Sequence, residues 1–345
     1  MKVLHLLQSN RFSGAENVVC QIIGMFKDNT DIEMAYCSRD GQIKEALDER
    51  DIRFFPMTQL CKSEVKRVID EYKPDVIHAH DMRASFIAAF VCGKTRLISH
   101  IHNSDFQARK ISPKSIAFRL KKRKFSKVIW VSDSCYKTYI FHNSFAKKST
   151  VLYNVIDRKS VLEKAAFDEN CYNYDIAYVG RIADPKNPLR LIRIIELIKQ
   201  KKPDVKVGIV GTGNLEESMK AEAERLGVTE NIVFHGFMSN PLGVLRSSKV
   251  MVVTSDREGL PMVALEAMSL GVPIVSTPTD GLCDVVKAGV TGYLEWDEAK
   301  FADRVLELIT DDNLQKAFSD LTLKEFEKIN DTENYKDVLK DAYGI

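Results

Sequence analysis

The sequence predicts an α/β protein built from two doubly wound parallel-sheet domains. The chain has 345 residues, which suits two domains of common size better than one. Short apolar strands alternate with amphipathic helices from the N-terminus onward, and the alternation starts again after the polar stretch 157–173. Because such alternation favours a parallel sheet covered on both faces, each half is predicted to form one sheet.

The first half begins with a strand at 3–7, followed by a loop that enters a helix across 13–26. Turn residues and Pro74 separate the elements that follow. These elements are strands at 32–37, 52–55, 76–79, 96–101, 128–131 and 150–153, and helices at 41–50, 63–72 and 83–92.

The second half repeats the pattern and ends in a charged helical region beyond residue 299. We expect a first domain over 1–155, a second over 156–327, and a final helix at about 328–345 that packs back on the first. Ligands of open α/β sheets bind at the carboxyl ends of the strands, so the loops that follow strands are the candidate sites. The predicted elements are strands at 176–179, 205–210, 232–234, 251–254 and 273–276, and helices at 187–199, 215–226 and 262–270.

The net charge of +2 hides two halves of opposite sign. Residues 1–155 carry 26 Lys and Arg against 16 Asp and Glu, a net of +10, whereas residues 156–345 carry 24 against 32, a net of −8. This asymmetry predicts an anionic surface or ligand facing the first half.

The seven cysteines are widely spaced and include no C-x-x-C pair, which predicts reduced thiols in a cytoplasmic protein. The N-terminus is too short and polar for a signal peptide. The longest nearly apolar run, 84–92, falls well below the ~20 residues of a membrane-spanning helix. We therefore expect any membrane contact to be peripheral.

The most informative stretch is 255–271, which follows an apolar strand. Pro261 stands where a helix should start and Gly271 just past its end. The N-terminus of such a helix offers backbone N–H groups and a positive dipole end to an anion. Glu258 precedes this helix and Glu266 lies within it, and a carboxylate can accept hydrogen bonds from two sugar hydroxyls. Taken singly, each is equally consistent with a surface glutamate.

This stretch resembles the E-x7-E signature of the retaining glycosyltransferases of family 4, which have the two-domain fold called GT-B. Ser13 replaces the first Gly of the family's Gly-Gly-Ala-Glu loop, and Val155 replaces the Gly of its inter-domain motif. Further segments that resemble the family's motifs follow in order at 13–16, 75–80, 154–157, 180–187, 210–213 and 234–236.

Two cations on one loop, Arg181 and Lys186, suit a nucleotide diphosphate and the charge that develops when it leaves. The resemblance implies that both bind the donor pyrophosphate, that Glu258 binds hydroxyls of the transferred sugar, and that His102 faces that sugar. Glu258 and His102 are accordingly the candidate catalytic residues. The resemblance also implies contacts to the pyrophosphate from Gly14, Gly259 and Leu260, and to the ribose or base from Glu266, Gly211, Phe237 and Met238.

Two of these segments have simpler interpretations. Gly211-Thr212-Gly213 lacks the third small residue of a dinucleotide fingerprint, because position 216 is Glu, so it more plausibly shapes a turn. The segment 234–238 either lines the base pocket or forms a buried strand end.

The pairs His78/His80 and His100/His102 each place two imidazoles on one face of a strand, where they could chelate a metal. Buried structural histidines and a single histidine at the binding cleft are the alternatives. We expect no metal and no cofactor besides the donor, because Arg181, Lys186 and a helix N-terminus can supply the positive charge.

The stretch 109–127 contains nine cations and no acid, interleaved with apolar residues. It favours an anionic membrane surface, with a merely solvated basic helix as the alternative; no nucleic-acid motif accompanies it. The patch predicted to face the membrane is Lys121, Lys122, Arg123 and Lys124.

The resemblance, together with the basic stretch 109–127, thus implies a glycosyltransferase at the inner face of the cell membrane. It would move a sugar from a nucleotide sugar, which we expect to be UDP-linked, to a lipid-linked glycan of a cell-surface polysaccharide or glycolipid. The alternatives are a non-catalytic GT-B-like subunit of a partner transferase and a metal-dependent hydrolase that uses the His-x-His pairs.

Overall fold

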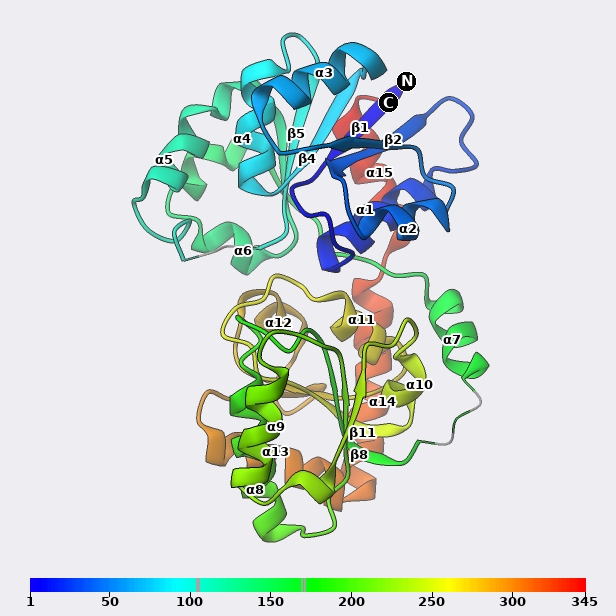
Figure 1. Cartoon of the computed structure of the whole chain (residues 1–345), viewed down its shortest axis with the longest axis vertical. Coiled ribbons are helices and arrows are strands. Elements are labelled where there is room, and N and C mark those ends of the chain that lie inside the picture. The colour runs from blue at the N-terminus through cyan, green and yellow to red at the C-terminus, as the bar shows by residue number, and fades with distance from the viewer. Residues whose placement is uncertain (104–105, 169, 171) are drawn as a thin grey trace. The chain divides into compact units, whose positions relative to one another are not determined.

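The computed structural model describes residues 1–103, 106–168, 170 and 172–345 (Figure 1). The chain divides into two compact units. Unit 1 comprises Met1–Asn154 and Thr332–Ile345, and unit 2 comprises Val155–Asp331. The last helix of the chain therefore belongs to the first unit.

Among the described residues, unit 1 contains a seven-stranded parallel sheet of order β3-β2-β1-β4-β5-β6-β7. The order reverses between β1 and β4, which is the switch point of a doubly wound fold. The strands are β1 (Lys2–Leu6), β2 (Glu33–Arg39), β3 (Phe54–Met57), β4 (Val76–His80), β5 (Arg96–Ile101), β6 (Phe125–Trp130) and β7 (Ser149–Val151).

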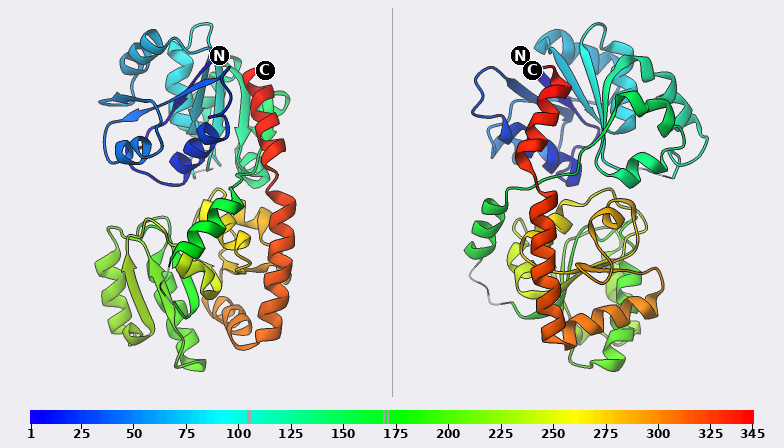
Figure 2. Two further views of the ribbon diagram at one scale, coloured as in Figure 1. Left: turned by 90° about the vertical axis from the view of Figure 1, so that its right-hand side faces the viewer. Right: turned by 180° about the vertical axis from the view of Figure 1, so that it is seen from behind.

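Helices connect these parallel strands. The chain re-enters unit 1 as α15, the last helix (Figure 2). The end of this helix is tied to the sheet, since the hydroxyl of Tyr343 lies 3.0 Å from Nδ1 of His78 and Arg96 donates to the carbonyl of Ala342 at 3.1 Å. The helices of unit 1 are α1 (Gly14–Met25), α2 (Ile43–Asp48), α3 (Lys62–Tyr72), α4 (Asp81–Val91), α5 (Pro113–Leu120), α6 (Asp133–Thr138) and α15 (Thr332–Tyr343), with the 3₁₀ turns η1 (Lys122–Lys124) and η2 (His142–Lys148).

The described part of unit 2 forms a six-stranded parallel sheet of order β10-β9-β8-β11-β12-β13, with its switch point between β8 and β11. Its strands are β8 (Tyr174–Val179), β9 (Val207–Val210), β10 (Ile232–Gly236), β11 (Ser248–Val253), β12 (Ile274–Ser276) and β13 (Gly292–Leu294). Its helices are α7 (Arg158–Phe167), α8 (Pro188–Lys201), α9 (Glu216–Arg225), α10 (Leu242–Arg246), α11 (Met262–Ser269), α12 (Asp280–Val285), α13 (Glu298–Thr310) and α14 (Asp312–Ile329), with η3 (Thr229–Asn231).

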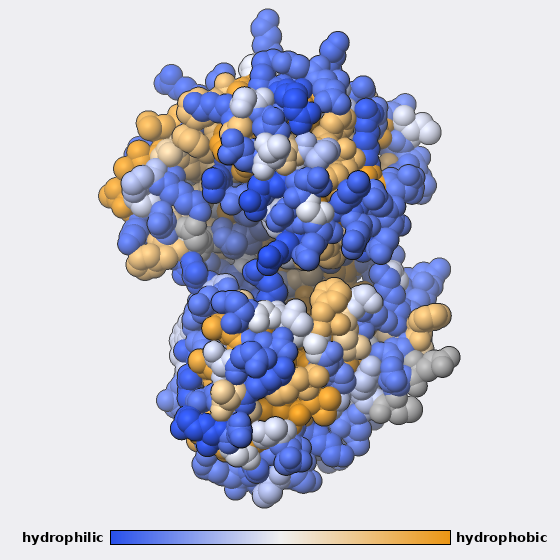
Figure 3. Space-filling view, viewed as in Figure 1, coloured by the Kyte–Doolittle hydropathy of each residue, from blue (hydrophilic) through white to orange (hydrophobic). Residues whose placement is uncertain are grey.

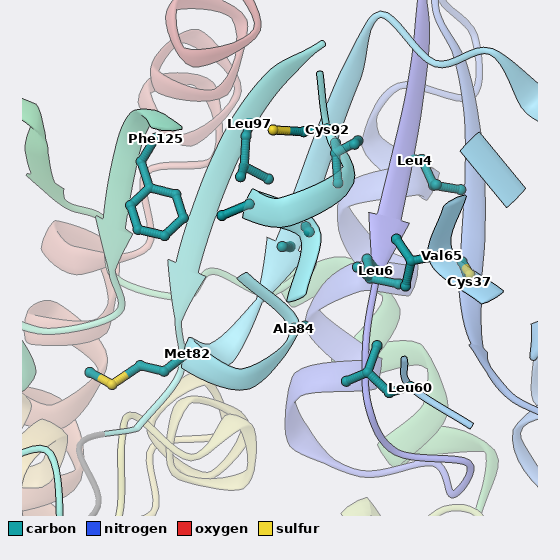
Figure 4. Close-up of a cluster of buried hydrophobic side chains, with 14 of the residues drawn as sticks. Leu4, Leu6, Cys37, Leu60, Val65, Met82, Ala84, Cys92, Leu97 and Phe125 are labelled. Atoms are coloured by element: carbon teal, nitrogen blue, oxygen red, sulfur yellow. The ribbon is translucent and has the colours of Figure 1, made fainter. Parts of the chain in front are cut away.

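Each sheet is buried on both faces, as its apolar strands require. In unit 1, side chains of β1, β5 and α3 pack with those of α4 into one core, which Figure 4 shows around Leu6, Leu97, Val65 and Ala84. In unit 2, Ile176, Ile209 and Val252 lie in the corresponding core.

The structure corrects the predicted linker between the two halves. The stretch 157–173 is not a plain linker, because it contains α7, whose start is fixed by Asp157 accepting a hydrogen bond from the backbone N–H of Ser160 at 3.2 Å. The final helix, α15, runs from Thr332 to Tyr343, within the predicted range of about 328–345, and α14 ends before it at Ile329.

Within the described ranges, no helix is both long and apolar enough to cross a lipid bilayer. The cysteines that the structure describes are Cys20, Cys37, Cys61, Cys92, Cys135 and Cys283, all of them free thiols; Cys171 lies outside the described residues.

Candidate functional site

The carboxyl edge of the unit 2 sheet gathers most of the predicted site residues. The loop after β8 carries Arg181 and Lys186, and the loop after β11 carries Glu258, Gly259 and Leu260. These two strands are neighbours at the switch point, so their loops open side by side at the place where doubly wound sheets bind ligands.

Lys186 and Glu258 form an ion pair between the two loops. The ammonium donates to the carboxylate at 2.5 Å, and the hydroxyl of Ser255 donates to the same oxygen, Oε1, at 2.6 Å. Only 18% of the Lys186 side chain and 11% of the Glu258 side chain are exposed, so both charges are largely shielded from water. The sequence analysis assigned the pyrophosphate to Lys186 and the sugar hydroxyls to Glu258. It predicted neither the contact between these two residues nor the hydrogen bond from Ser255.

Backbone and hydroxyl contacts hold the two loops together. The hydroxyl of Thr254 donates to the carbonyls of Lys186 and Asn187 at 3.1 and 3.2 Å. The backbone N–H of Asp256 donates to the carbonyl of Pro185 at 2.9 Å. The backbone around Lys186 is therefore held by the first residues of the loop that follows β11.

Glycines bring the loop after β9 against the loop that carries Arg181. A Cβ on Gly211, whose φ is +136°, would lie 1.9 Å from the carbonyl oxygen of Gly180, and one on Gly213 would lie 2.1 Å from that of Ile182. The N–H of Ile182 donates to the carbonyl of Thr212 at 3.0 Å. The Gly-x-Gly pair is thus needed for close backbone packing, which leaves the exposed Arg181 at the edge.

The N-terminus of α11 follows Gly259 and Leu260, both buried. A Cβ on Gly281, at the start of α12, would lie 1.9 Å from the carbonyl oxygen of Gly259, so this backbone is also closely packed. The helix starts one residue after Pro261 and is followed by Gly271 at φ +72°. Its first N–H groups and positive dipole end face the same edge as Lys186.

Glu266 lies on α11 beside α7. Burial raises the pKa of its carboxyl to about 7, and the charge of Lys164 on α7 opposes this rise. Beyond β10, Phe237 is 78% exposed, so the segment is not a buried strand end. Residues around a surface hollow at this end of unit 2 are Phe167, Asp168, Asn170, Phe237, Met238, Ser239 and Asn240.

In unit 1, the carboxyl edge of the sheet carries Gly14 and His102. Gly14 is the first residue of α1, and a Cβ there would meet nothing within 4 Å, so open space adjoins the backbone. Ser13 donates its hydroxyl to Glu16 at 2.5 Å. Burial raises the pKa of Glu16, and the nearby charge of Asp81 raises it further. Glu16 and Asp81 were not predicted as site residues.

Asp81 adopts a left-handed backbone conformation, with φ of 66°, and its Oδ1 accepts the backbone N–H of His102 at 3.0 Å. A non-glycine residue in this region stores about 1–3 kcal/mol of strain, which is typical of functional sites. The contact ties the end of β5 to the start of α4.

Five histidines lie together on one face of the unit 1 sheet. The centroids of neighbouring imidazoles lie 4.4–5.4 Å apart. The ring of Tyr343 meets that of His78 edge-on at a centroid distance of 5.7 Å. Burial lowers the pKa of every one of the five histidines, to about 3 for His5 and His102. The members of this histidine cluster are His5, His78, His80, His100 and His102.

Both ring nitrogens of His80 are hydrogen-bonded within the cluster. Its Nε2 lies 3.1 Å from Nδ1 of His5, and its Nδ1 lies 2.8 Å from Nε2 of His102. Ligand atoms of two triplets of these histidines come within 4.8 Å of one another, close enough for a metal ion. A metal bound by either triplet would have to displace a hydrogen bond of His80. Within the described residues, Nε2 of His5, Nε2 of His78 and both ring nitrogens of His100 are buried without a hydrogen-bond partner.

The basic stretch 109–127 folds into α5, η1 and the start of β6. Phe118 and Phe125 are core residues, whereas Ile111, Ile116 and Leu120 are 71%, 40% and 76% exposed. Figure 3 shows hydrophobic side chains among hydrophilic ones at the edge that carries α5. Of the predicted patch, Lys121 lies 3.4 Å from the centre of the Phe90 ring, Lys122 is half-buried, and Arg123 and Lys124 are exposed.

Two family models together match most of this chain. Residues 12–160 match the model described as Glycosyltransferase Family 4, and residues 163–324 match Glycosyl transferases group 1.

Individual relatives cover nearly the whole chain. The capsular polysaccharide biosynthesis glycosyltransferase CapM of Staphylococcus aureus is 27% identical over 326 residues, covering 86% of this chain and 85% of CapM. An Escherichia coli enzyme named UDP-Gal:alpha-D-GlcNAc-diphosphoundecaprenol alpha-1,3-galactosyltransferase is 23% identical, and the match covers 92% of this chain and 90% of that enzyme. The crystal structure of Anabaena HepE in complex with UDP-glucose superposes with a TM-score of 0.85 at 22% identity, covering 99% of this chain and 98% of HepE.

Proposed function

Because this chain belongs to the glycosyltransferases of family 4 and has the GT-B fold, we propose that it transfers a hexosyl group from a UDP-linked donor to a lipid-linked glycan, with retention of the anomeric configuration. The product would be a cell-surface polysaccharide or glycolipid. The observation that carries the proposal is the convergence of Arg181, Lys186, Glu258 and the N-terminus of α11 at one sheet edge.

The proposed reaction breaks the bond between the anomeric carbon and the β-phosphate oxygen of the donor. The acceptor hydroxyl oxygen bonds to the anomeric carbon on the same face, and its proton passes to the leaving phosphate, which releases UDP. Lys186 and Arg181 stabilise the charge that grows on this phosphate, together with the N–H groups of α11. Glu258 orients the sugar hydroxyls, and Glu266 binds the ribose beside Phe237, Met238 and Gly211.

The nature of donor and acceptor is supported by relatives. HepE has a crystal structure in complex with UDP-glucose, and the name of the Escherichia coli relative gives a UDP-linked donor and a diphosphoundecaprenol acceptor. A panel of nucleotide sugars tests the donor: a UDP-sugar at 100 times its Kd is expected to stabilise the folded protein by about 2.7 kcal/mol, measured by thermal unfolding. Stabilisation only by nucleotides of another base would contradict the proposal.

We expect transfer to need no divalent metal, because the cations of unit 2 already offset the leaving-group charge. UDP release with the donor found in the panel should proceed at the same rate in EDTA as in Mg²⁺. A rate that collapses in EDTA and returns with added metal would contradict this expectation. Binding of the donor with no turnover on any lipid-linked acceptor would instead favour an accessory subunit.

The acceptor side is proposed to meet an anionic membrane through α5 and η1, at the inner face of the cell membrane. The support is a surface that combines exposed apolar residues with lysines, notably Ile111, Leu120 and Lys121. Each Lys or Arg near such a surface contributes about 1 kcal/mol, or about fivefold in affinity.

Vesicle sedimentation tests this surface. Lys121→Ala and Lys124→Ala are each expected to weaken binding to phosphatidylglycerol vesicles by about fivefold. Leu120→Ser should weaken it as well, since its apolar contact is lost. Lys206→Ala, an exposed lysine of unit 2, should change nothing. Equal binding to neutral phosphatidylcholine vesicles, or no effect of the α5 and η1 variants, would contradict the assignment.

A further inference from the structure

Three imidazoles of unit 1 form a continuous hydrogen-bonded relay. Nδ1 of His5 on β1 meets Nε2 of His80 on β4, and Nδ1 of His80 meets Nε2 of His102 after β5, at 3.1 and 2.8 Å. His5 is fully buried, His80 is 2% exposed, and His102 is 9% exposed. The relay therefore runs from the core to the carboxyl edge of the sheet.

The relay has a direction, because its members are neutral. Burial lowers the pKa of all three imidazoles far below neutral pH. A neutral imidazole carries one N–H and one lone pair, so His80 donates to one neighbour and accepts from the other. Either every N–H lies on Nδ1 and points outward along the relay, or every N–H lies on Nε2 and points inward.

The inner end decides between the two directions. Nε2 of His5 is buried and meets no hydrogen-bond partner within the described ranges 1–103, 106–168, 170 and 172–345. The inward direction would place an N–H on this atom, whereas the outward direction leaves it a bare lone pair. Orphaned buried N–H groups are the rarer and costlier of the two. The outward direction is therefore the stable one.

The geometry points to a defined role for His102: its Nδ1–H is held as a hydrogen-bond donor toward an oxygen of the substrate at the carboxyl edge of the unit 1 sheet, and His80 and His5 are positioning residues that fix this tautomer and the ring plane. His102 thus acts as a neutral donor and not as a general base. The contact to substrate rests on the proposed function, but the tautomer does not.

Nitrogen NMR of the full chain labelled with ¹⁵N-histidine tests the tautomer without any substrate. Long-range ¹H–¹⁵N correlations are expected to show His102, His80 and His5 protonated at Nδ1, with signals assigned from single substitutions. A proton on Nε2 of His102 would overturn the inference, whatever the activity of the enzyme.

Paired substitutions at His102 test which nitrogen donates. The amide nitrogen of asparagine lies at the same number of bonds from Cα as Nδ1, and that of glutamine is placed nearer to Nε2. His102→Asn is therefore expected to keep kcat within about tenfold, and His102→Gln to lose about 100-fold, as for a misplaced group. Glutamine outperforming asparagine would overturn the donor assignment. If both variants kept full activity although NMR of the wild-type protein showed His102 protonated at Nδ1, His102 would not belong to the proposed site.

Substitutions at His80 separate positioning from mere stability. His80→Gln retains a donor for His102 and an acceptor for His5, whereas His80→Leu retains neither. The leucine variant should lose about 10- to 100-fold in kcat with an altered His102 ¹⁵N signal, and the glutamine variant should restore both. His78→Leu is the matched control on the same strand face, since His78 bonds Tyr343 instead. It should lower stability while leaving the His102 signal unchanged; an equal change in that signal would contradict the relay.

Discussion

Lys186→Ala is expected to lower the rate of sugar transfer by about 100- to 1,000-fold, the usual cost of removing one group that stabilises charge in a transition state. Lys186 has the position for this role because its backbone is held by Thr254, the residue that follows β11, and its ammonium lies at the switch-point edge. Glu258→Ala should have a comparable effect, since the sugar loses its orienting carboxylate. The rates are measured as UDP release with the preferred donor.

Two comparisons make this result specific. Lys206→Ala, at the opposite end of β9, removes an exposed cation of the same unit and should leave the rate unchanged. The double variant Lys186→Ala/Glu258→Ala should lose far less than the product of the single effects, because the two side chains form one ion pair 2.5 Å long. Full activity in either single variant would contradict the site.

Acidification from pH 7.5 to 5.5 is expected to remove about 7 kcal/mol of stability from unit 1. The folded-state pKa of each histidine in the cluster lies below its unfolded value near 6.5, so the unfolded chain binds more protons as the pH falls. Stability is therefore complete above pH 6.5 and is lost below it, by about 1.4 kcal/mol per histidine per pH unit. The five residues together reach the scale of a whole domain's stability, about 5–15 kcal/mol.

Glu16 opposes this trend, because burial raises its folded-state pKa and protonation stabilises it in place. Its effect grows as the pH falls through the raised folded-state pKa toward 4.5. A single carboxyl changes the stability by at most about 1.4 kcal/mol per pH unit, so the five histidines together dominate between pH 7.5 and 5.5. The chain contains two tryptophans, Trp130 in unit 1 and Trp296 in unit 2. Urea unfolding of Trp296→Phe, followed by Trp130 fluorescence, reports on unit 1.

Substitution of His100 gives the clearest test of this pH dependence. It is fully buried, and neither ring nitrogen finds a hydrogen-bond partner within the described part of the chain. His100→Leu should reduce the dependence of the unfolding free energy on pH by about 1.4 kcal/mol per pH unit below 6.5. His142→Gln replaces a partly exposed histidine and should leave the slope as it is. A stability of unit 1 that is flat from pH 7.5 to 5.5 would contradict the neutral cluster.

Local patterns in the sequence were enough to place the edge loops of both sheets. The strand before Glu258, the helix after Pro261 and the glycine at 271 appear where the pattern predicts them, because short-range turn and capping signals determine them. Helix α7 was missed because its apolar residues have little periodicity. Its capping residue, Asp157, was the signal that could have located it.

Contacts between segments that lie far apart in the chain could not be predicted from the sequence. His5 and His80 are 75 residues apart, and Lys186 and Glu258 are 72 apart. Their meeting depends on which strands become neighbours in the sheet, and periodicity along the chain carries no such information. The His-x-His pairs were recognised, but His5 gave no local signal, so the relay that links three strands was not foreseen.

Titration calorimetry with UDP tests the account most directly, because it needs neither the sugar nor the acceptor to be known. The wild-type protein and Lys206→Ala are expected to bind UDP with equal affinity, and Lys186→Ala is expected to bind it at least tenfold more weakly. No binding of UDP to the wild-type protein, or equal binding by Lys186→Ala, would contradict the claim that the loops after β8 and β11 hold the donor.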